Sequence, residues 1–239
     1  MKEKKVDKFF LIIIFLLLTI GVAVFISASL GVYAKNENLF KSVLFNQLIL
    51  GLGCGLIAMY ICLKINYKFW RKYSFLIFLG AILLTVSVFI PGVGWSHGGA
   101  FRWVKIGLIS FQPVEILKFS FIVYFAAWLS WVKNKVQNFR FGILPLGIML
   151  AVIAGVLLKQ PDTKSFILIT ITGIIMLFIS GVPMKYILGI GLGVMIFLGG
   201  LVLYKPYLQE RVKTFINPGA DPRGSAYQIQ QSLIALGSG

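Results

Sequence analysis

Charged side chains are scarce in this sequence. They make up 13% of the 239 residues, whereas apolar residues make up 59%. Ordinary soluble domains contain about 25% charged residues, so the low charge excludes a conventional soluble fold. Lys and Arg nevertheless outnumber Asp and Glu by 23 to 7. These basic residues lie between apolar runs rather than on one helix face, which indicates membrane topology and anionic lipids and argues against a nucleic-acid partner.

Residues that bind metals or form disulfides are equally few. Cys54 and Cys62 fall in one apolar run without a neighbouring His or acid, so the sequence supports neither a disulfide framework nor a zinc site. His97 is the single histidine and lies in a glycine-rich loop, where a solvated side chain is the usual state. The sequence has no Gly-Lys-Ser/Thr phosphate loop and no paired-His zinc motif. ATP-driven pumping and metalloproteolysis therefore have no support, and no cofactor is required.

Apolar runs of about 20 residues recur along the chain, and this length crosses a hydrocarbon core as a helix. We predict an all-α, polytopic transmembrane helical bundle with about seven complete spans and the start of an eighth. The predicted spans cover about residues 9–31, 43–63, 73–90, 112–132, 141–158, 165–181 and 185–204, and the eighth begins near 228. We expect residues 1–239 to form a single membrane domain that is part of a longer one.

The basic residues also predict the orientation of the spans, because short cytoplasmic loops retain positive charge. With the N-terminus in the cytoplasm, twelve of the 23 Lys and Arg residues fall in cytoplasmic segments. Most of the other eleven gather in three outer segments, about 91–111, 159–164 and 205–227. Positive charge placed against the topological preference needs a reason, and an anionic ligand on the outer face is a physical one.

The first outer segment, residues 91–111, contains glycines and a proline that preclude a regular helix. Trp95 and Trp103 suit a membrane interface, and Arg102 and Lys105 supply cations there. Two interpretations stay open for this segment: a re-entrant interfacial loop, and an aromatic belt with snorkelling cations.

Three acidic positions are candidates for function. Glu115 and Lys118 share a helical face and can neutralise each other, either as a functional pair or as a structural link between helices. Asp162 is either an N-terminal cap of the next span or a site residue. Asp221 is followed by Pro, Arg and Gly, which is typical of a simple turn. If the outer face needs a carboxylate base, however, Asp221 is the acid in a predicted loop flanked by cations.

Four segments, in order, resemble the SEDS family of FtsW, RodA and SpoVE proteins, which act in bacterial cell-wall synthesis. They are Gly99-Ala100-Phe101-Arg102-Trp103, Gln112-Pro113-Val114-Glu115 with Lys118, Gln160-Pro161-Asp162, and residues 211–218 followed by Asp221-Pro222, Tyr227-Gln228 and residues 231–235 and 237–239. A Pro-Gly before the first segment and the Asn-Pro in the last are more similar to FtsW than to RodA. The sequence departs from the family pattern at Phe101, Val114, Thr163-Lys164-Ser165 and Ala226, where Arg, Ser, Leu-Gly-Thr and Gly are usual.

The resemblance implies a peptidoglycan glycosyltransferase that polymerises lipid II on the outer face of the bacterial cytoplasmic membrane during cell division. It implies inverting transfer with undecaprenyl pyrophosphate as the leaving group, Asp221 as the essential carboxylate, and Arg102 with Trp103 as part of the site. The acceptor hydroxyl must lose a proton as it attacks the anomeric carbon, which suits a carboxylate base. The other candidates for substrate contact are Lys105, Glu115, Lys118, Asp162, Arg211, Lys213 and Arg223. The basic residues of outer segments 91–111 and 205–227 are suited to stabilise pyrophosphate, and Mg²⁺ or Mn²⁺ is a possible aid.

The resemblance also implies partners, namely lipid II, a class B penicillin-binding protein transpeptidase and other divisome proteins. The family normally has about ten spans, so this chain would lack the last two and most of the eighth. A lipid II flippase and a divisome scaffold stay open as alternatives. Transporters usually place charges near the bilayer midplane on broken helices, whereas the charges here gather toward the predicted outer surface.

Overall fold

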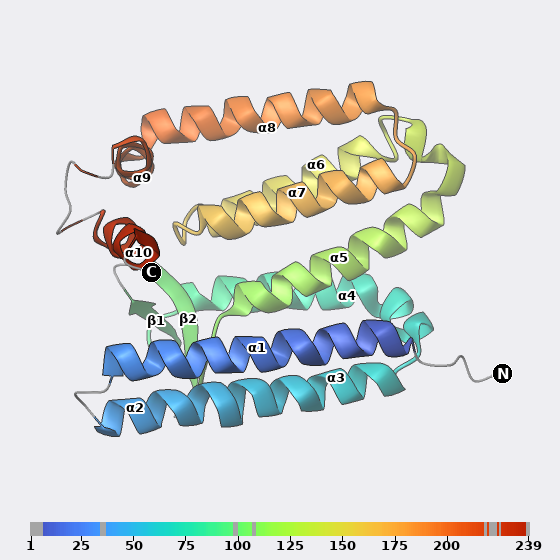
Figure 1. The fold of residues 1–239 in the computed structure, drawn as a ribbon. Coiled ribbons are helices and arrows are strands. Elements are labelled where there is room, and N and C mark those ends of the chain that lie inside the picture. The colour runs from blue at the N-terminus through green and yellow to red at the C-terminus, as the bar shows by residue number, and fades with distance from the viewer. Residues whose placement is uncertain are drawn as a thin grey trace. The chain divides into compact units, whose positions relative to one another are not determined.

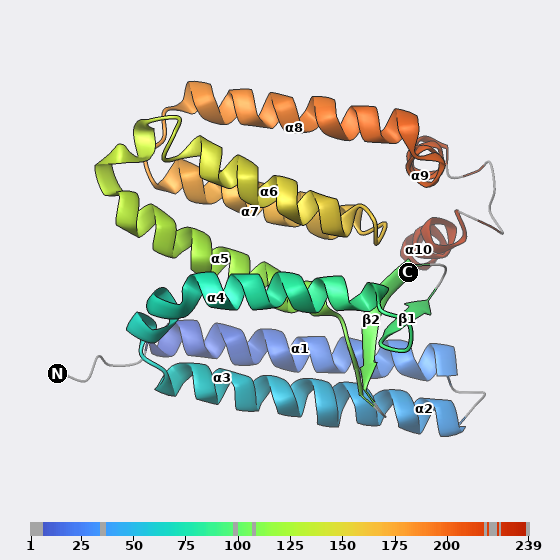
Figure 2. The ribbon, with the colours of Figure 1, turned by 180° about the vertical axis from the view of Figure 1, so that it is seen from behind.

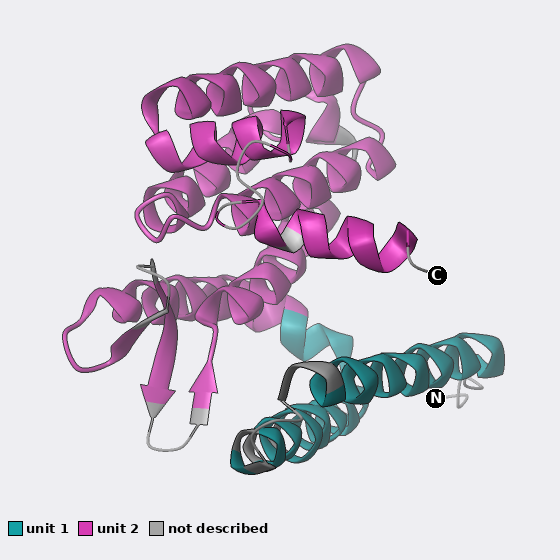
Figure 3. Cartoon of the chain, turned by 60° about the vertical axis from the view of Figure 1, so that its left-hand side comes forward, with its two compact units in different colours: residues 1–70 teal, residues 71–239 magenta. Residues whose placement is uncertain are grey.

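The computed structural model describes residues 7–33, 37–97, 100–106, 109–217, 219, 224 and 226–237. Within these ranges the chain consists of helices and one small sheet (Figure 1). It divides into two compact units, residues 1–70 and 71–239, which are described separately (Figure 3). Five helices in the described part of the chain are long and apolar enough to cross a membrane. The predicted transmembrane helical fold is thereby confirmed, whereas the number of spans and the single-domain organisation stay predictions.

The first unit is a helical hairpin. Helix α1 (Lys8–Tyr33) has 26 residues and is therefore about 39 Å long, enough to cross a bilayer. Helix α2 (Glu37–Leu44), a π-helical stretch (Phe45–Gly53) and α3 (Cys54–Lys64) form one continuous rod beside α1 (Figures 1 and 2). Both cysteines lie on α3 and are exposed free thiols.

Most helices of the second unit begin and end within a few residues of their predicted positions. They are α4 (Tyr67–Val86), which starts in the first unit and continues into a 3-10 turn (Ser87–Phe89), α5 (Pro113–Val132), followed by a second 3-10 turn (Lys133–Gln137), α6 (Ile143–Leu157), α7 (Thr163–Ile179), α8 (Met184–Tyr204), α9 (Pro206–Ile216) and α10 (Tyr227–Gly237). Proline occupies the first turn of α5, where its missing N–H would have no partner in any helix.

Helices α5, α6 and α7 enclose the core of the second unit. Phe121 and Phe125 of α5, Ile153 of α6 and Ile169 of α7 are buried within it. Gly173 on α7 makes the close approach possible, since an added Cβ would lie 2.7 Å from the Leu146 side chain. Lipid tails are as apolar as these residues, so van der Waals packing rather than removal from water stabilises this contact.

A three-stranded antiparallel sheet connects α4 to α5. Its strands are β1 (Gly94–His97), β2 (Ala100–Ile106) and β3 (Ile109–Phe111), in the order β1-β2-β3. Trp95 pairs with Trp103 across β1 and β2, and the register shifts after Trp95. The sequence predicts a segment without regular helix here, either a re-entrant interfacial loop or an aromatic belt with snorkelling cations. In the structure, strand pairing supplies hydrogen-bond partners for the backbone N–H and C=O groups of this segment.

Gly94, at the start of β1, has no room for a side chain, because an added Cβ would lie 1.8 Å from the carbonyl oxygen of Val88. We expect Gly94→Ala to lower the free energy of unfolding by more than about 2 kcal/mol, since backbone must move to admit the methyl group. Thermal unfolding in detergent micelles measures the loss. Gly80→Ala on α4 is the matched control, because nothing lies within 4 Å of its added Cβ. Equal unfolding temperatures for the two variants would contradict the close approach.

Helix α9 lies within the segment 205–227, for which the sequence predicts a polar loop. It begins one residue after α8 and crosses the end of that helix (Figures 1 and 2). Leu208 is buried, while Val212 and Phe215, four and seven positions later on the same face, are 41% and 80% exposed. Because α8 alone is about 31 Å long, α9 starts where α8 leaves the hydrocarbon core. We therefore expect α9 to lie in the membrane interface with this apolar face toward the acyl chains.

Tryptophan fluorescence tests the interfacial position of α9. In bilayers that contain brominated lipids, we expect a tryptophan introduced by Phe215→Trp to be quenched at least twice as strongly as one introduced by Glu210→Trp, on the opposite face. The five native tryptophans are first replaced by phenylalanine to remove their signal. Equal quenching at both positions would show that α9 stands away from the lipid.

Candidate functional site

The turn between α6 and α7, residues 160–162, is the most connected polar feature of the second unit. Gln160 and Asp162 are polar side chains, yet they are only 2% and 1% exposed. Buried polar groups need hydrogen-bond partners, because an unpaired one costs about 1–3 kcal/mol. The partners of this turn come from α4, β2, the start of α5 and the first turn of α7.

Arg102 on β2 binds the main chain of this turn. Its Nε donates to the carbonyl oxygen of Gln160 at 3.1 Å, and its Nη2 donates to the carbonyl oxygen of Pro161. The side-chain amide of Gln160 in turn donates to the carbonyl oxygen of Thr85, near the end of α4, at 2.7 Å. The planar guanidinium suits this task because two of its N–H groups can reach two neighbouring carbonyls.

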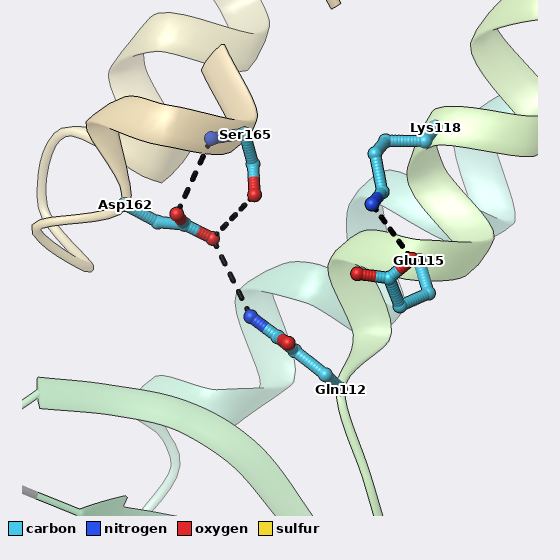
Figure 4. Close-up of polar contacts among 5 residues, drawn as sticks. All are labelled: Gln112, Glu115, Lys118, Asp162 and Ser165. Atoms are coloured by element: carbon cyan, nitrogen blue, oxygen red, sulfur yellow. Dashed lines mark hydrogen bonds and ion pairs between the residues drawn. The ribbon is translucent and has the colours of Figure 1, made fainter. Parts of the chain in front are cut away.

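Asp162 caps the N-terminus of α7 (Figure 4). One carboxylate oxygen accepts from the backbone N–H of Ser165 at 3.3 Å, and the other accepts from the Ser165 hydroxyl at 2.8 Å. The second oxygen also accepts from the amide of Gln112 at 3.5 Å, which joins the start of α5 to the start of α7. The capping interpretation of Asp162 is therefore confirmed, and contact with substrate stays a prediction. Ser165 departs from the family's usual Thr but keeps the hydroxyl that this cap uses.

Glu115 and Lys118 form an ion pair within α5, with Lys118 Nζ 2.7 Å from a carboxylate oxygen of Glu115 (Figure 4). The side chain of Glu115 is 60% exposed and that of Lys118 is 24% exposed. A pair this accessible contributes only about 0.3 kcal/mol to the helix. The two charges therefore add little stability, and their contact with substrate stays a prediction.

The basic candidates lie on the sheet and on α9. Lys105 extends from β2 over the ring of Trp95, with Nζ 5.4 Å from the ring centroid. Arg211 lies over the ring of Tyr207, within α9, at 6.0 Å. Lys213 is an exposed residue of the same helix. Each cation thus keeps an accessible position, and two of them are held over an aromatic ring.

The structure brings only part of the predicted site together. Arg102 and Asp162 meet at the turn, and Trp103 and Lys105 lie on the same strand as Arg102. Asp221 and Arg223 lie outside the described residues, so their predicted roles stay predictions.

The prediction also missed three polar partners, namely Gln112, Gln160 and Tyr207. Each glutamine precedes a proline near a helix start, and this repeated Gln-Pro pair was the signal that could have identified them. Tyr207 is not part of a Gln-Pro pair, so it gave no such signal.

Metal ligands are not assembled in the part of the chain that the structure describes. No three His, Cys, Asp or Glu side chains there lie close enough to hold an ion. A role for Mg²⁺ or Mn²⁺ stays a prediction.

These features define a multi-pass membrane protein in which a small sheet, the starts of α5 and α7 and the end of α4 join through buried hydrogen bonds. The chain belongs to the FtsW/RodA/SpoVE family of cell cycle proteins, whose family model it matches over residues 7–239. The family resemblance seen in the sequence is thereby confirmed.

Curated relatives carry names from cell-wall synthesis and sporulation. The probable peptidoglycan glycosyltransferase FtsW of Trichlorobacter lovleyi is 34% identical over 233 residues, which cover 98% of this chain and 61% of that protein. The stage V sporulation protein E of Bacillus subtilis is 35% identical over 239 residues, or 100% of this chain and 65% of that protein. The chain thus spans less than two thirds of the length of these relatives.

Solved structures share the fold. A chain of a peptidoglycan synthase complex, described as coordinating polymerization and crosslinking, superimposes with a TM-score of 0.70 at 24% identity. The match covers 92% of this chain and 63% of that one. The rod shape determining protein RodA of Thermus thermophilus gives a TM-score of 0.57 at 21% identity, covering 76% of this chain and 58% of RodA.

Proposed function

We propose that the protein is a peptidoglycan glycosyltransferase that polymerises lipid II on the outer face of the bacterial cytoplasmic membrane during cell division. One observation carries the proposal. Residues from three of the sequence segments that carry the resemblance, Arg102, Gln112 and Asp162, come together at a single buried turn. Glycosyl transfer needs distant groups held in fixed positions, and a hydrogen-bonded cluster of this kind provides them. The names of the FtsW relatives support the same reaction.

The chemistry is set by the substrate. A hydroxyl oxygen of the acceptor sugar attacks the anomeric carbon of the donor, and the bond from that carbon to the pyrophosphate oxygen breaks with its electron pair. The configuration at the anomeric carbon is inverted. The hydroxyl proton passes to the carboxylate of Asp221, which acts as general base. Pyrophosphate leaves without a catalytic acid, because nearby cations stabilise its charge.

The described residues divide into two roles in this reaction. Lys105, Arg211 and Lys213 are accessible cations that bind the pyrophosphate of the donor. Arg102 and Asp162 hold the turn beside them. A guanidinium has five N–H donors, so Arg102 can bind both carbonyls of the turn and still donate to an anionic group.

A reconstitution assay tests the proposed function. The complete protein is inserted into liposomes with lipid II and no other polymerase, and the products are separated by size. Glycan chains are the expected result. Translocation of lipid II without polymer would instead indicate a flippase. If polymer forms only after a class B penicillin-binding protein is added to the liposomes, the transpeptidase is an obligatory partner.

A further inference from the structure

Tyr207 connects α9 to the start of α7. Its hydroxyl lies 2.7 Å from the hydroxyl of Thr163, which is the first residue of α7 and comes directly after Asp162. Thr163 is 6% exposed, and Tyr207 is half-buried. Because Thr163 is buried, competing water has limited access to this hydrogen bond, which can help to hold the two helices together.

The contact depends on a residue at which this chain departs from its family. Leucine is usual in the position of Thr163, and leucine can neither donate nor accept a hydrogen bond. The departure therefore has a structural counterpart, since a hydroxyl is present on both sides and the two oxygens are at hydrogen-bond distance.

The ring of Tyr207 has a second contact. The guanidinium of Arg211, one helical turn later on α9, lies over that ring with its carbon 6.0 Å from the centroid. Tyr207 thus contacts the start of α7 through its hydroxyl and Arg211 through its ring face. The position of Arg211 relative to the start of α7 therefore depends on how firmly Tyr207 holds α9 there.

We infer that Tyr207 is a positioning residue, which fixes α9 against the start of α7 through Thr163 and thereby places Arg211 for the pyrophosphate of the donor. This inference rests on the proposed function for its substrate, but not for the contact itself. The pyrophosphate is already anionic when the donor binds, so Arg211 contacts it with similar strength before and during the reaction, and losing this placement mainly weakens binding of the donor. The expected result is a higher KM with little change in kcat.

Kinetic measurements test the role. In the complete protein, Tyr207→Phe removes the hydroxyl and keeps the ring. We expect it to raise KM for lipid II about five-fold, the effect of one neutral hydrogen bond, with kcat within about two-fold. Thr163→Val should have the same effect, and the double variant should be no worse than either single one. Thr163→Ser keeps a hydroxyl at this position and should have the same KM as the wild-type protein. A fall in kcat at constant KM would indicate mere loss of folded protein and would overturn the assignment.

Distance measurements test the contact without any substrate. Spin labels are attached to cysteines introduced by Leu168→Cys on α7 and Glu210→Cys on α9, both exposed, after the native cysteines are replaced by alanine. We expect a single narrow distance distribution that broadens in Tyr207→Phe. An unchanged distribution would overturn the role of Tyr207 in holding α9, and a broader one with unchanged KM would overturn its role toward substrate. If the wild-type protein forms no polymer, the proposed function fails, whereas the distances still decide whether Tyr207 holds α9.

Discussion

Polymerisation of lipid II falls by at least about 1,000-fold when Asp221 is replaced by asparagine, if this carboxylate is the general base. The amide has nearly the same shape but cannot accept the proton of the acceptor hydroxyl at neutral pH. Initial rates of glycan formation in liposomes measure the loss. Glu210→Gln is the matched control, because it neutralises another carboxylate of the same predicted outer segment, on the exposed face of α9. Full activity of the Asp221→Asn variant would refute the assignment.

The same prediction requires residue 221 to be accessible from the non-cytoplasmic side. A cysteine introduced by Asp221→Cys should react with a membrane-impermeant maleimide added outside intact cells. Reaction only after the cells are opened would place the residue in the cytoplasm. It could not then serve as base for a substrate on the outer face.

The helices were the most predictable part of the fold. An apolar run of about 20 residues has one favourable arrangement in a bilayer, because every backbone N–H and C=O must be paired within the segment. The runs predicted at 112–132 and 185–204 therefore match α5 (Pro113–Val132) and α8 (Met184–Tyr204) closely. The N-terminal cap at Asp162 was also predicted as one of two alternatives. Asp is a preferred residue before a helix, because its carboxylate accepts from the free N–H groups of the first turn.

The sheet and α9 were not predicted, because their patterns are short and mixed. Strand β2 contains Phe101 and Trp103 next to Arg102 and Lys105, and this order is equally typical of an interfacial loop. In α9 the apolar positions 208, 212 and 215 do have helical spacing. Arg211 and Lys213 lie between these positions and raise the polarity of the segment, so the helical spacing was overlooked.

The hydrogen bonds of the 160–162 turn could not be predicted from the sequence. Arg102 and Gln160 are 58 positions apart, and spacing along the chain contains no information on such a contact. The family resemblance implied that Arg102 is part of the substrate site. The structure adds a second use for the same side chain, the main-chain carbonyls of the turn, and the two uses predict different results for one substitution.

Arg102→Lys separates these two uses, because it keeps the positive charge and removes the planar guanidinium. A lysine ammonium on its flexible chain cannot reproduce the two parallel bonds to the carbonyls of Gln160 and Pro161. At least one buried carbonyl is then left unpaired, at a cost of about 1–3 kcal/mol in the free energy of unfolding. We expect the rate of polymerisation to fall about 100-fold, since displacement of a positioned group by about 1 Å has an effect of that size.

Comparison with Arg102→Met and with a distant arginine makes the result decisive. If holding the turn is the main task of Arg102, the Lys and Met variants lose activity to a similar extent, because neither can bind both carbonyls. If its charge alone matters, Arg102→Lys retains most of the activity while Arg102→Met does not. Arg140→Lys, at an exposed turn before α6, controls for the exchange itself and should leave both the rate and the unfolding temperature unchanged. A lysine variant as active and as stable as this control would show that the bonds between β2 and the turn are dispensable.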